Sequence, residues 1–323
     1  MEQLVSRPEL ESLLEAIVRR TPDPRAGIFG PGSITWKINR EAALFLGAGR
    51  AALLQLAHPW VAGALAEHSS LLGDPIARFH NTFRIVFTMI FGSLDQALAA
   101  ARYLHTLHTH IRGELRDPVA RWPRGAHYEA NEIDALRWVF ATLIESAVLA
   151  YECVLPLSNE ERDGYYNESK TMAALFGIPS SSLPENWSAF RGYTRGMVVS
   201  DTLGVDATAR STAHALLSGQ VPGSAFPAGI VRLLRSGCRI ACAKPLRWNT
   251  LLPTEEPRFG RACGCRECGK PCPHASATWA RGMKRRRVSL IVNPELLRTL
   301  VTDFGSEGHF FRLEMTSDSN LLK

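Results

Sequence analysis

Apolar side chains recur at helical spacing along most of this 323-residue chain, from residue 8 to about residue 242. In the first helix, the apolar residues at positions 10, 13, 14 and 17 follow the i, i+3, i+4, i+7 spacing of one helix face. No convincing strand pattern precedes residue 285, and residues 287–293 form only a weak strand candidate. Such a chain buries its apolar faces by packing helix on helix, so we predict an all-α fold, a single large helical domain.

Proline, glycine and helix-capping residues divide this pattern into separate helices. Gly47 and Gly49 predict a break between two helical segments. Asn131 and Ser158 are expected N-caps, and Glu161 completes a capping box with Ser158. After the first helix, the spacing predicts helices over residues 42–46, 51–67, 76–91, 94–111, 132–155, 158–175, 184–199 and 207–217.

Composition separates three parts of the chain. We expect an N-terminal helix and linker at 1–27, the helical domain at 28–243, and an irregular Cys- and Arg-rich tail at 244–323. Residues 231–290 hold fourteen Lys or Arg against three Asp or Glu, a local charge of +11, whereas the whole chain carries +6. The basic character therefore belongs to the C-terminal part. We interpret the KRRR run within it as solvated charge and expect no nucleic-acid partner.

The N-terminal residues do not resemble a secretion signal, because three of the first nine are charged. The longest apolar stretch, residues 42–66, is interrupted by Arg50 and His58, which is typical of a buried helix rather than a membrane span. We therefore expect a cytoplasmic protein without a transmembrane segment. Peripheral contact with a membrane is compatible with this expectation.

Three histidines lie within residues 103–113, which read YLHTLHTHIRG. On a helical wheel, His108 falls within about 40° of the centre of an apolar arc, whereas His110 points away and His105 lies at the edge. The sequence thus predicts one inward histidine rather than a three-histidine zinc site. The arc consists of Leu94, Ala97, Ala100, Ala101, Leu104, Leu107 and Ile111.

An inward imidazole has three interpretations: a core histidine with a hydrogen bond, a general acid or base, or an axial ligand of a large apolar cofactor. The preceding helix bears on the choice, because Arg78 and Thr82 lie in a second stripe with Ile85 and Met89. A buried guanidinium needs an anionic partner. A haem propionate, a substrate carboxylate or a protein carboxylate each meets that need.

Further polar residues lie on the helices upstream. His58 precedes a proline, and Glu67 and His68 end the same apolar stretch. Together with the residues above, these exceed what packing requires, and they match the needs of a haem or iron pocket with polar distal groups. His58, Glu67 and His68 therefore join Arg78 and Thr82 as candidate catalytic residues.

Several stretches resemble, in order, the rubber oxygenase and mycophenolate-pathway oxygenase (MpaB-like) catalytic domain, formerly a domain of unknown function. They are GPGSITWKINREAALFLGAGRAALLQLAHPWVAGALAEHS, DPIARFHNTFR, FG, LHTHIRG and YEANEIDALRWVFATLIES, between residues 30 and 146. The resemblance covers roughly residues 28–220. It implies an all-α fold that encloses one noncovalent haem b. It also implies an enzyme that uses O₂ to oxygenate or oxidatively cleave a small hydrophobic, isoprenoid-like substrate.

The resemblance also assigns residues. It makes His108 the proximal ligand of the haem iron and places Arg78 and Thr82 near the haem, while His58 and His68 match family histidines of the preceding helix. Rubber oxygenases have a lysine just before the threonine, where this chain has Asn81, so a lysine-capped resting state is not expected.

Two alternatives remain open beside this assignment. One is a non-enzymatic helical binding protein, in which the polar residues pair internally.

The other alternative is metal binding through the tail. Residues 261–274, RACGCRECGKPCPH, place four cysteines at the spacing C-x-C-x₂-C-x₃-C. Four thiolates at short spacing can hold zinc or an iron–sulfur cluster, although the first spacing is one residue shorter than in a ferredoxin run. The candidate ligands of this possible second metal are Cys263, Cys265, Cys268 and Cys272.

Overall fold

The computed structural model describes residues 3–68, 75–218, 220–221 and 224–225, and within these the side chains of residues 75–80 are left aside. The chain divides into two units, Met1–Phe259 and Gly260–Lys323, and all described residues belong to the first unit. The predicted strand at 287–293, the KRRR run and the four clustered cysteines therefore lie outside the described residues.

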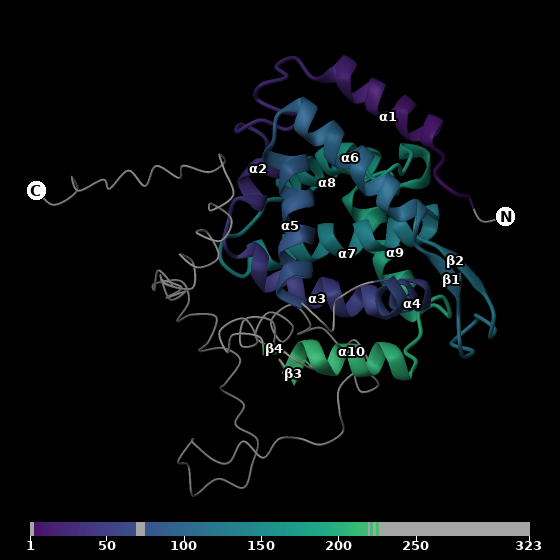
Figure 1. The fold of residues 1–323 in the computed structure, drawn as a ribbon. Coiled ribbons are helices and arrows are strands. Elements are labelled where there is room, and N and C mark those ends of the chain that lie inside the picture. Colours follow the sequence, from purple (N-terminus) through teal and green to yellow (C-terminus); the bar gives the residue numbers. More distant parts are fainter. Residues whose placement is uncertain (1–2, 69–74, 219, 222–223, 226–323) are drawn as a thin grey trace, which may run out of the picture. The chain divides into compact units, whose positions relative to one another are not determined.

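The described part is mostly helical, with two pairs of short strands, which confirms the predicted all-α class (Figure 1). No helix in this part is both long and apolar enough to cross a membrane. The helices are α1 (Arg7–Arg20), α2 (Ile34–Asn39), α3 (Leu44–Leu56), α4 (Pro59–His68), α5 (Pro75–Phe91), α6 (Leu94–Thr109), α7 (Ile133–Glu152), α8 (Asn159–Leu175), α9 (Trp187–Val199), α10 (Ala207–Ser218) and the 3₁₀ turn η1 (Ser180–Ser182).

Helix α7 forms the centre of the core. Its side chains are buried around most of its circumference, and Trp138, Phe140 and Val148 are at most 1% exposed. Figure 1 shows α3 beside α7, and α1 over α6 and α8. Because α7 is apolar on nearly all sides, it must be surrounded by other helices to be stable in water.

Helix α3 runs without a break through Gly47 and Gly49, so the predicted interruption there was wrong. The helix instead ends at Leu56, shortly before Pro59 begins α4. A Cβ atom on Gly47 would lie 2.6 Å from the carbonyl oxygen of Ser146 in α7. The glycine at position 47 therefore serves the close packing of α3 on α7 rather than a turn.

The predicted caps differ in outcome. Ser158 and Glu161 form the expected capping box at the start of α8. The N-cap of α7 is Glu132 rather than Asn131, because the Glu132 carboxylate accepts a hydrogen bond from the backbone N–H of Ala135. The Asn131 amide instead donates to the carbonyl oxygen of His105.

The expectation of no strand before residue 285 was wrong. Strands β1 (Arg112–Glu114) and β2 (His127–Glu129) form an antiparallel pair after α6. Strands β3 (Gln220–Val221) and β4 (Ser224–Ala225) form a second antiparallel pair. Strands of two or three residues are too short to show an alternating pattern, which is why the sequence did not reveal them.

Candidate functional site

The histidines of α6 are oriented differently from the prediction. His105 is the buried one, at 7% exposure, and its Nε2 atom lies 2.9 Å from the carbonyl oxygen of Val5. His108 is half-buried and His110 is exposed. The prediction of a buried His108 with His105 at the edge was therefore wrong. The N-terminal segment before α1 covers this side of α6. A helical wheel drawn for α6 alone does not take contacts with other segments into account.

His108 lies at the border between two sides of α6. On a wheel of 100° per residue, the buried side is centred about 40° from His108 in the direction of His105. A second apolar side is centred about 70° away in the other direction and is only partly covered. Leu104 on that side is half-buried, and Leu107 is 40% exposed. The imidazole thus borders an apolar surface that other helices leave incompletely covered.

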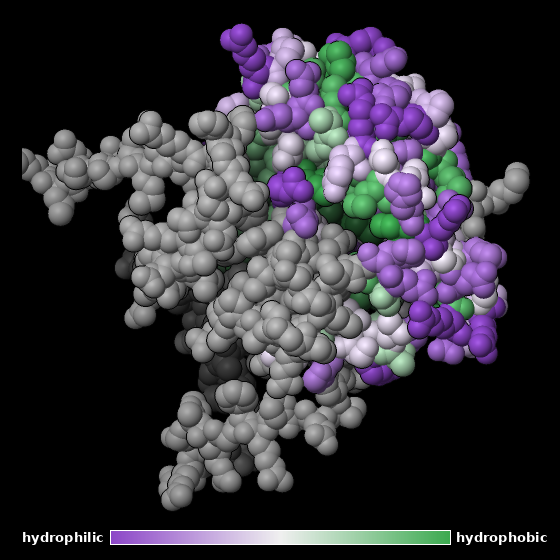
Figure 2. All heavy atoms as spheres, in the orientation of Figure 1, coloured by the Kyte–Doolittle hydropathy of each residue, from purple (hydrophilic) through white to green (hydrophobic). Residues whose placement is uncertain are grey.

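Helix α5 also carries apolar side chains that are not fully buried. Phe83 and Phe87 are half-buried and their ring centroids lie 5.2 Å apart, whereas Met89 and Ile90 are buried near the connection to α6. Thr82 is half-buried beside them and Asn81 is exposed. Figure 2 shows hydrophobic side chains at the surface of the face on which α5 and α6 lie, among hydrophilic ones.

Helices α5 and α6 are consecutive and are joined at Gly92 and Ser93, from which Figure 1 shows them diverging. At a rise of 1.5 Å per residue, Arg78 on α5 and His108 on α6 both lie about 20 Å along their helices from this connection. The backbones of Arg78 and His108 therefore lie on different helices, each far from the connection between α5 and α6. The Arg78 side chain lies outside the described part.

This arrangement fits a haem in two respects. A haem needs a protein ligand to its iron, often an imidazole nitrogen, and a large apolar surface around it. His108 offers the nitrogen, and Leu104, Leu107 and Phe83 offer apolar surface. Within the described residues, no group of three or more His, Cys, Asp or Glu side chains could hold a bare metal ion.

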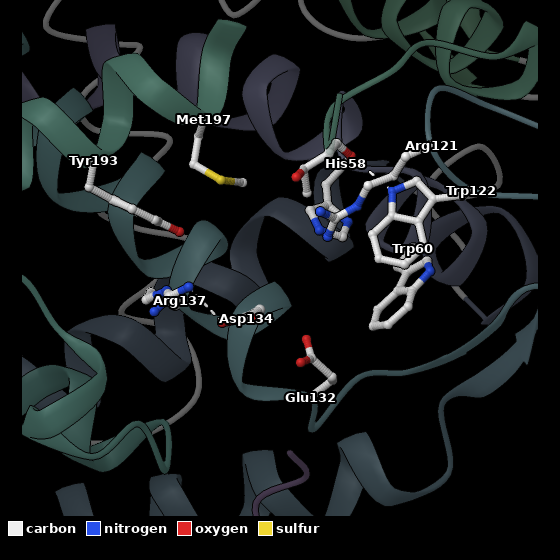
Figure 3. A pocket seen from close by; sticks show the side chains of 10 residues that line it. His58, Trp60, Arg121, Trp122, Glu132, Asp134, Arg137, Tyr193 and Met197 are labelled. Atoms are coloured by element: carbon white, nitrogen blue, oxygen red, sulfur yellow. Dashed lines mark hydrogen bonds and ion pairs between the residues drawn. The ribbon is translucent and has the colours of Figure 1, made fainter. Parts of the chain in front are cut away.

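His58 lies elsewhere, in a pocket of about 490 Å³ (Figure 3). It is 2% exposed, and burial together with the nearby Arg121 guanidinium lowers the pKa of its imidazole to about 4. The pocket contains no residue of α5 or α6. It is lined by His58, Trp60, Arg121, Trp122, Glu132, Asp134, Arg137, Tyr193, Met197 and Thr202.

Glu67 and His68, at the end of α4, meet the β1–β2 pair instead. Tyr128 donates a hydrogen bond of 2.6 Å to the Glu67 carboxylate, and Arg116 donates one of 3.1 Å. These bonds lower the pKa of Glu67, the Tyr128 contact most strongly. The Nε2 atom of His68 lies 3.0 Å from the carbonyl oxygen of Arg112. Glu67 is thus a paired carboxylate and a weak proton acceptor.

The sequence analysis missed a buried ion network between α3, α7 and α9. Glu145 pairs with Arg50 and with Arg191, and it accepts a hydrogen bond of 2.8 Å from Thr194. Arg50 and Glu145 are each only 4% exposed. The signal available in the sequence was Arg50 itself, a charge within the longest apolar stretch.

The predicted site residues therefore fall into four places: His108 on α6; Thr82 and the Arg78 backbone on α5; His58 in its own pocket; and Glu67 with His68 beside the strands. Comparison with known families gives a match that covers residues 36–267. The matching family is described as ER-bound oxygenase mpaB/B′/rubber oxygenase, catalytic domain. Neither curated proteins nor solved structures gave a match.

Proposed function

Because the chain belongs to the family of mpaB/B′ and rubber oxygenase catalytic domains, we propose that it is an oxygenase that binds one haem b through His108. The observation that carries the proposal is the position of His108 beside a partly covered apolar surface of α6. An imidazole there would be a suitable iron ligand, and the flanking Leu104 and Leu107 side chains would place apolar surface beside it.

The residues of α5 complete the proposed site. The Arg78 guanidinium would pair with a haem propionate. This pairing would neutralise the positive charge of Arg78 on an otherwise apolar helix face. The Thr82 hydroxyl, one helical turn further along α5, would offer a hydrogen bond on the same side of that helix. Phe83 and Phe87 would form the apolar wall. When bound, haem supplies iron-centred oxygen chemistry that amino-acid side chains cannot provide.

We assign the substrate to small hydrophobic molecules with a C=C bond, of isoprenoid type. Half-buried leucines and phenylalanines favour an apolar substrate. Oxidative cleavage of the double bond is balanced by O₂ alone, because each former alkene carbon gains one oxygen atom as a carbonyl. The reaction therefore needs no external reductant.

Absorption spectroscopy of the purified, haem-supplied protein tests the cofactor. We expect a Soret band that is lost in His108→Ala. His110→Ala is the matched control, because His110 lies two residues away and is exposed, and it should keep the band. A protein that stays colourless after haem supply, or a His108→Ala variant with an unchanged band, contradicts the proposal and favours a non-enzymatic helical binding protein.

The substrate class has its own test. Squalene contains isoprenoid double bonds, and squalane is its saturated counterpart. We expect O₂ uptake and carbonyl products with squalene and neither with squalane. Equal O₂ uptake with both compounds would contradict cleavage at a double bond, and carbonyl-free oxygenated products from squalene would indicate oxygenation without cleavage.

A further inference from the structure

We propose that the pocket around His58 is a second binding site, which takes a small aromatic carboxylate with its carboxylate toward Trp60 and Arg121. The site lies between the start of α4, the segment at residues 121–122, the start of α7, and α9 (Figure 3). None of its lining residues belongs to α5 or α6. The inference therefore goes beyond the proposed oxygenase function and does not depend on it.

Four buried polar atoms of the lining residues lack a hydrogen-bond partner among the described residues: Trp60 Nε1, His58 Nδ1, Arg137 Nε and the Tyr193 hydroxyl oxygen. The first two belong to neighbouring rings, because the centroids of His58 and Trp60 lie 6.0 Å apart. An indole N–H can only donate, so Trp60 needs an acceptor. Buried polar groups are rarely left unpaired in folded proteins, because burial without a partner costs the full loss of hydration. An acceptor oxygen of a ligand would satisfy Trp60 directly.

His58 can serve the same ligand as a donor. With a pKa lowered to about 4 it is neutral near pH 7, and a neutral imidazole carries one N–H. In the tautomer with the proton on Nδ1, His58 and Trp60 each donate from their unpaired nitrogen atom. A carboxylate has two oxygen atoms and several lone pairs, so it can accept from both side chains at once.

The charged side chains around the pocket sum to zero, but their arrangement favours an anion near His58. Four charged side chains face it, of which Arg137 and Asp134 neutralise each other at 2.6 Å. Glu132 is engaged as the N-cap of α7, 2.7 Å from the Ala135 nitrogen. The Arg121 guanidinium lies 4.5 Å from the centroid of the Trp122 ring, and its charge contributes to the lowered pKa of His58. The Glu132 carboxylate keeps its charge, but Arg121 is the charge that acts on His58, so an anion is favoured at the His58 end of the pocket.

The walls of the pocket suit a flat, apolar body. The rings of Trp60 and Trp122 lie 4.6 Å apart at 47°, and Met197 and Tyr193 approach from α9 (Figure 3). Trp122 is held in place because its Nε1 atom donates a 3.0 Å bond to the carbonyl oxygen of Thr202. A volume of about 490 Å³ lies within the range of small-molecule pockets.

Titration calorimetry with benzoate, and with benzamide as the uncharged analogue of the same shape, tests the site in the full chain. We expect benzoate to bind at least about tenfold more tightly than benzamide, because a charge-assisted contact to Arg121 is lost in the amide. Trp60→Phe keeps a ring but removes the N–H, and Arg121→Gln removes the charge. Each should weaken benzoate about tenfold.

Arg124→Gln provides the matched control, because Arg124 is an exposed arginine close in sequence that does not line the pocket. It should leave the affinity for benzoate unchanged. Absence of benzoate binding at 10 mM, equal affinity for benzamide, or equal losses in Arg121→Gln and Arg124→Gln would each overturn the proposal. Benzoate binding should persist in His108→Ala, so failure of the haem assignment and failure of this site are distinguishable.

Discussion

The burial of His58 couples the protonation of this side chain to folding. In the unfolded chain its pKa is near 6.5, whereas in the folded protein burial and Arg121 lower it to about 4. The unfolded state therefore binds the proton more readily, and stability falls as the pH drops through this interval. Above about pH 7.5 the imidazole is neutral in both states and has no such effect.

We expect His58→Asn to reduce this pH dependence, because asparagine does not titrate. Between pH 7 and pH 4 the free energy of unfolding should fall by about 3 kcal/mol less in the variant than in the parent protein. Urea unfolding at several pH values measures the difference. His110→Asn is the control, since His110 is exposed, and it should follow the parent. Parallel curves for His58→Asn and the parent would contradict the assigned burial effect.

The histidines of α6 illustrate what a single helix can and cannot predict. The periodicity correctly indicated an amphipathic helix, but it placed His108 inside and His105 at the edge. The decisive contact of His105 is the carbonyl oxygen of Val5, which lies 100 residues away in sequence. No local pattern contains such a contact. Assignment of His108 to haem iron therefore rests on the family and on the half-buried position, not on complete burial.

Close contact between α3 and α7 depends on glycine at position 47. A Cβ atom there would lie 2.6 Å from the Ser146 carbonyl oxygen and 3.2 Å from the Cβ atom of Ala150. Both neighbours belong to the central helix and cannot withdraw without a shift of its backbone. The same interface contains the buried pair of Arg50 and Glu145, so separation of the two helices would also expose or weaken this pair.

Gly47→Ala should therefore destabilise the protein by about 1–3 kcal/mol, even though alanine is the better helix former. Gly196→Ala is the matched control in α9, because a Cβ atom at that position meets nothing within 4 Å. It should stabilise the protein by about 0.5–1 kcal/mol. Thermal unfolding of both variants checks the opposite signs, and a stabilising Gly47→Ala would contradict the proposed close packing.

Long periodic helices were predicted well and short elements were not. The predicted helix at 158–175 differs from α8 by one residue at its start, and that at 76–91 differs likewise from α5. The short helix α2 and the strands β1 and β2 were not predicted, because fewer than two turns or three alternations give no usable period. Glycine misled the prediction at α3, since the sequence alone does not distinguish a helix break from a close contact.

At the scale of the whole chain, the family match extends beyond the predicted C-terminal end of the helical domain. The match reaches residue 267, beyond residue 243, and so includes two of the four clustered cysteines, Cys263 and Cys265. These cysteines lie outside the described residues, and their role remains a prediction from sequence. The C-x-C spacing at the start of the run is one residue shorter than the ferredoxin run, which argues against a cluster of that type.

We therefore expect a single metal in the whole protein, the haem iron. In metal analysis, the double variant Cys263→Ser and Cys268→Ser should keep the same iron per chain and the same Soret band as the parent, with no zinc or acid-labile sulfide in either. Cys153→Ser is the control, since Cys153 is half-buried at the end of α7 and lies outside the cysteine run in sequence. Zinc or sulfide that is present in the parent and absent only from the double variant would instead establish a second metal site in the tail. In that case the oxygenase domain and the tail would bind their metals independently, because the Soret band would persist while the second metal disappears.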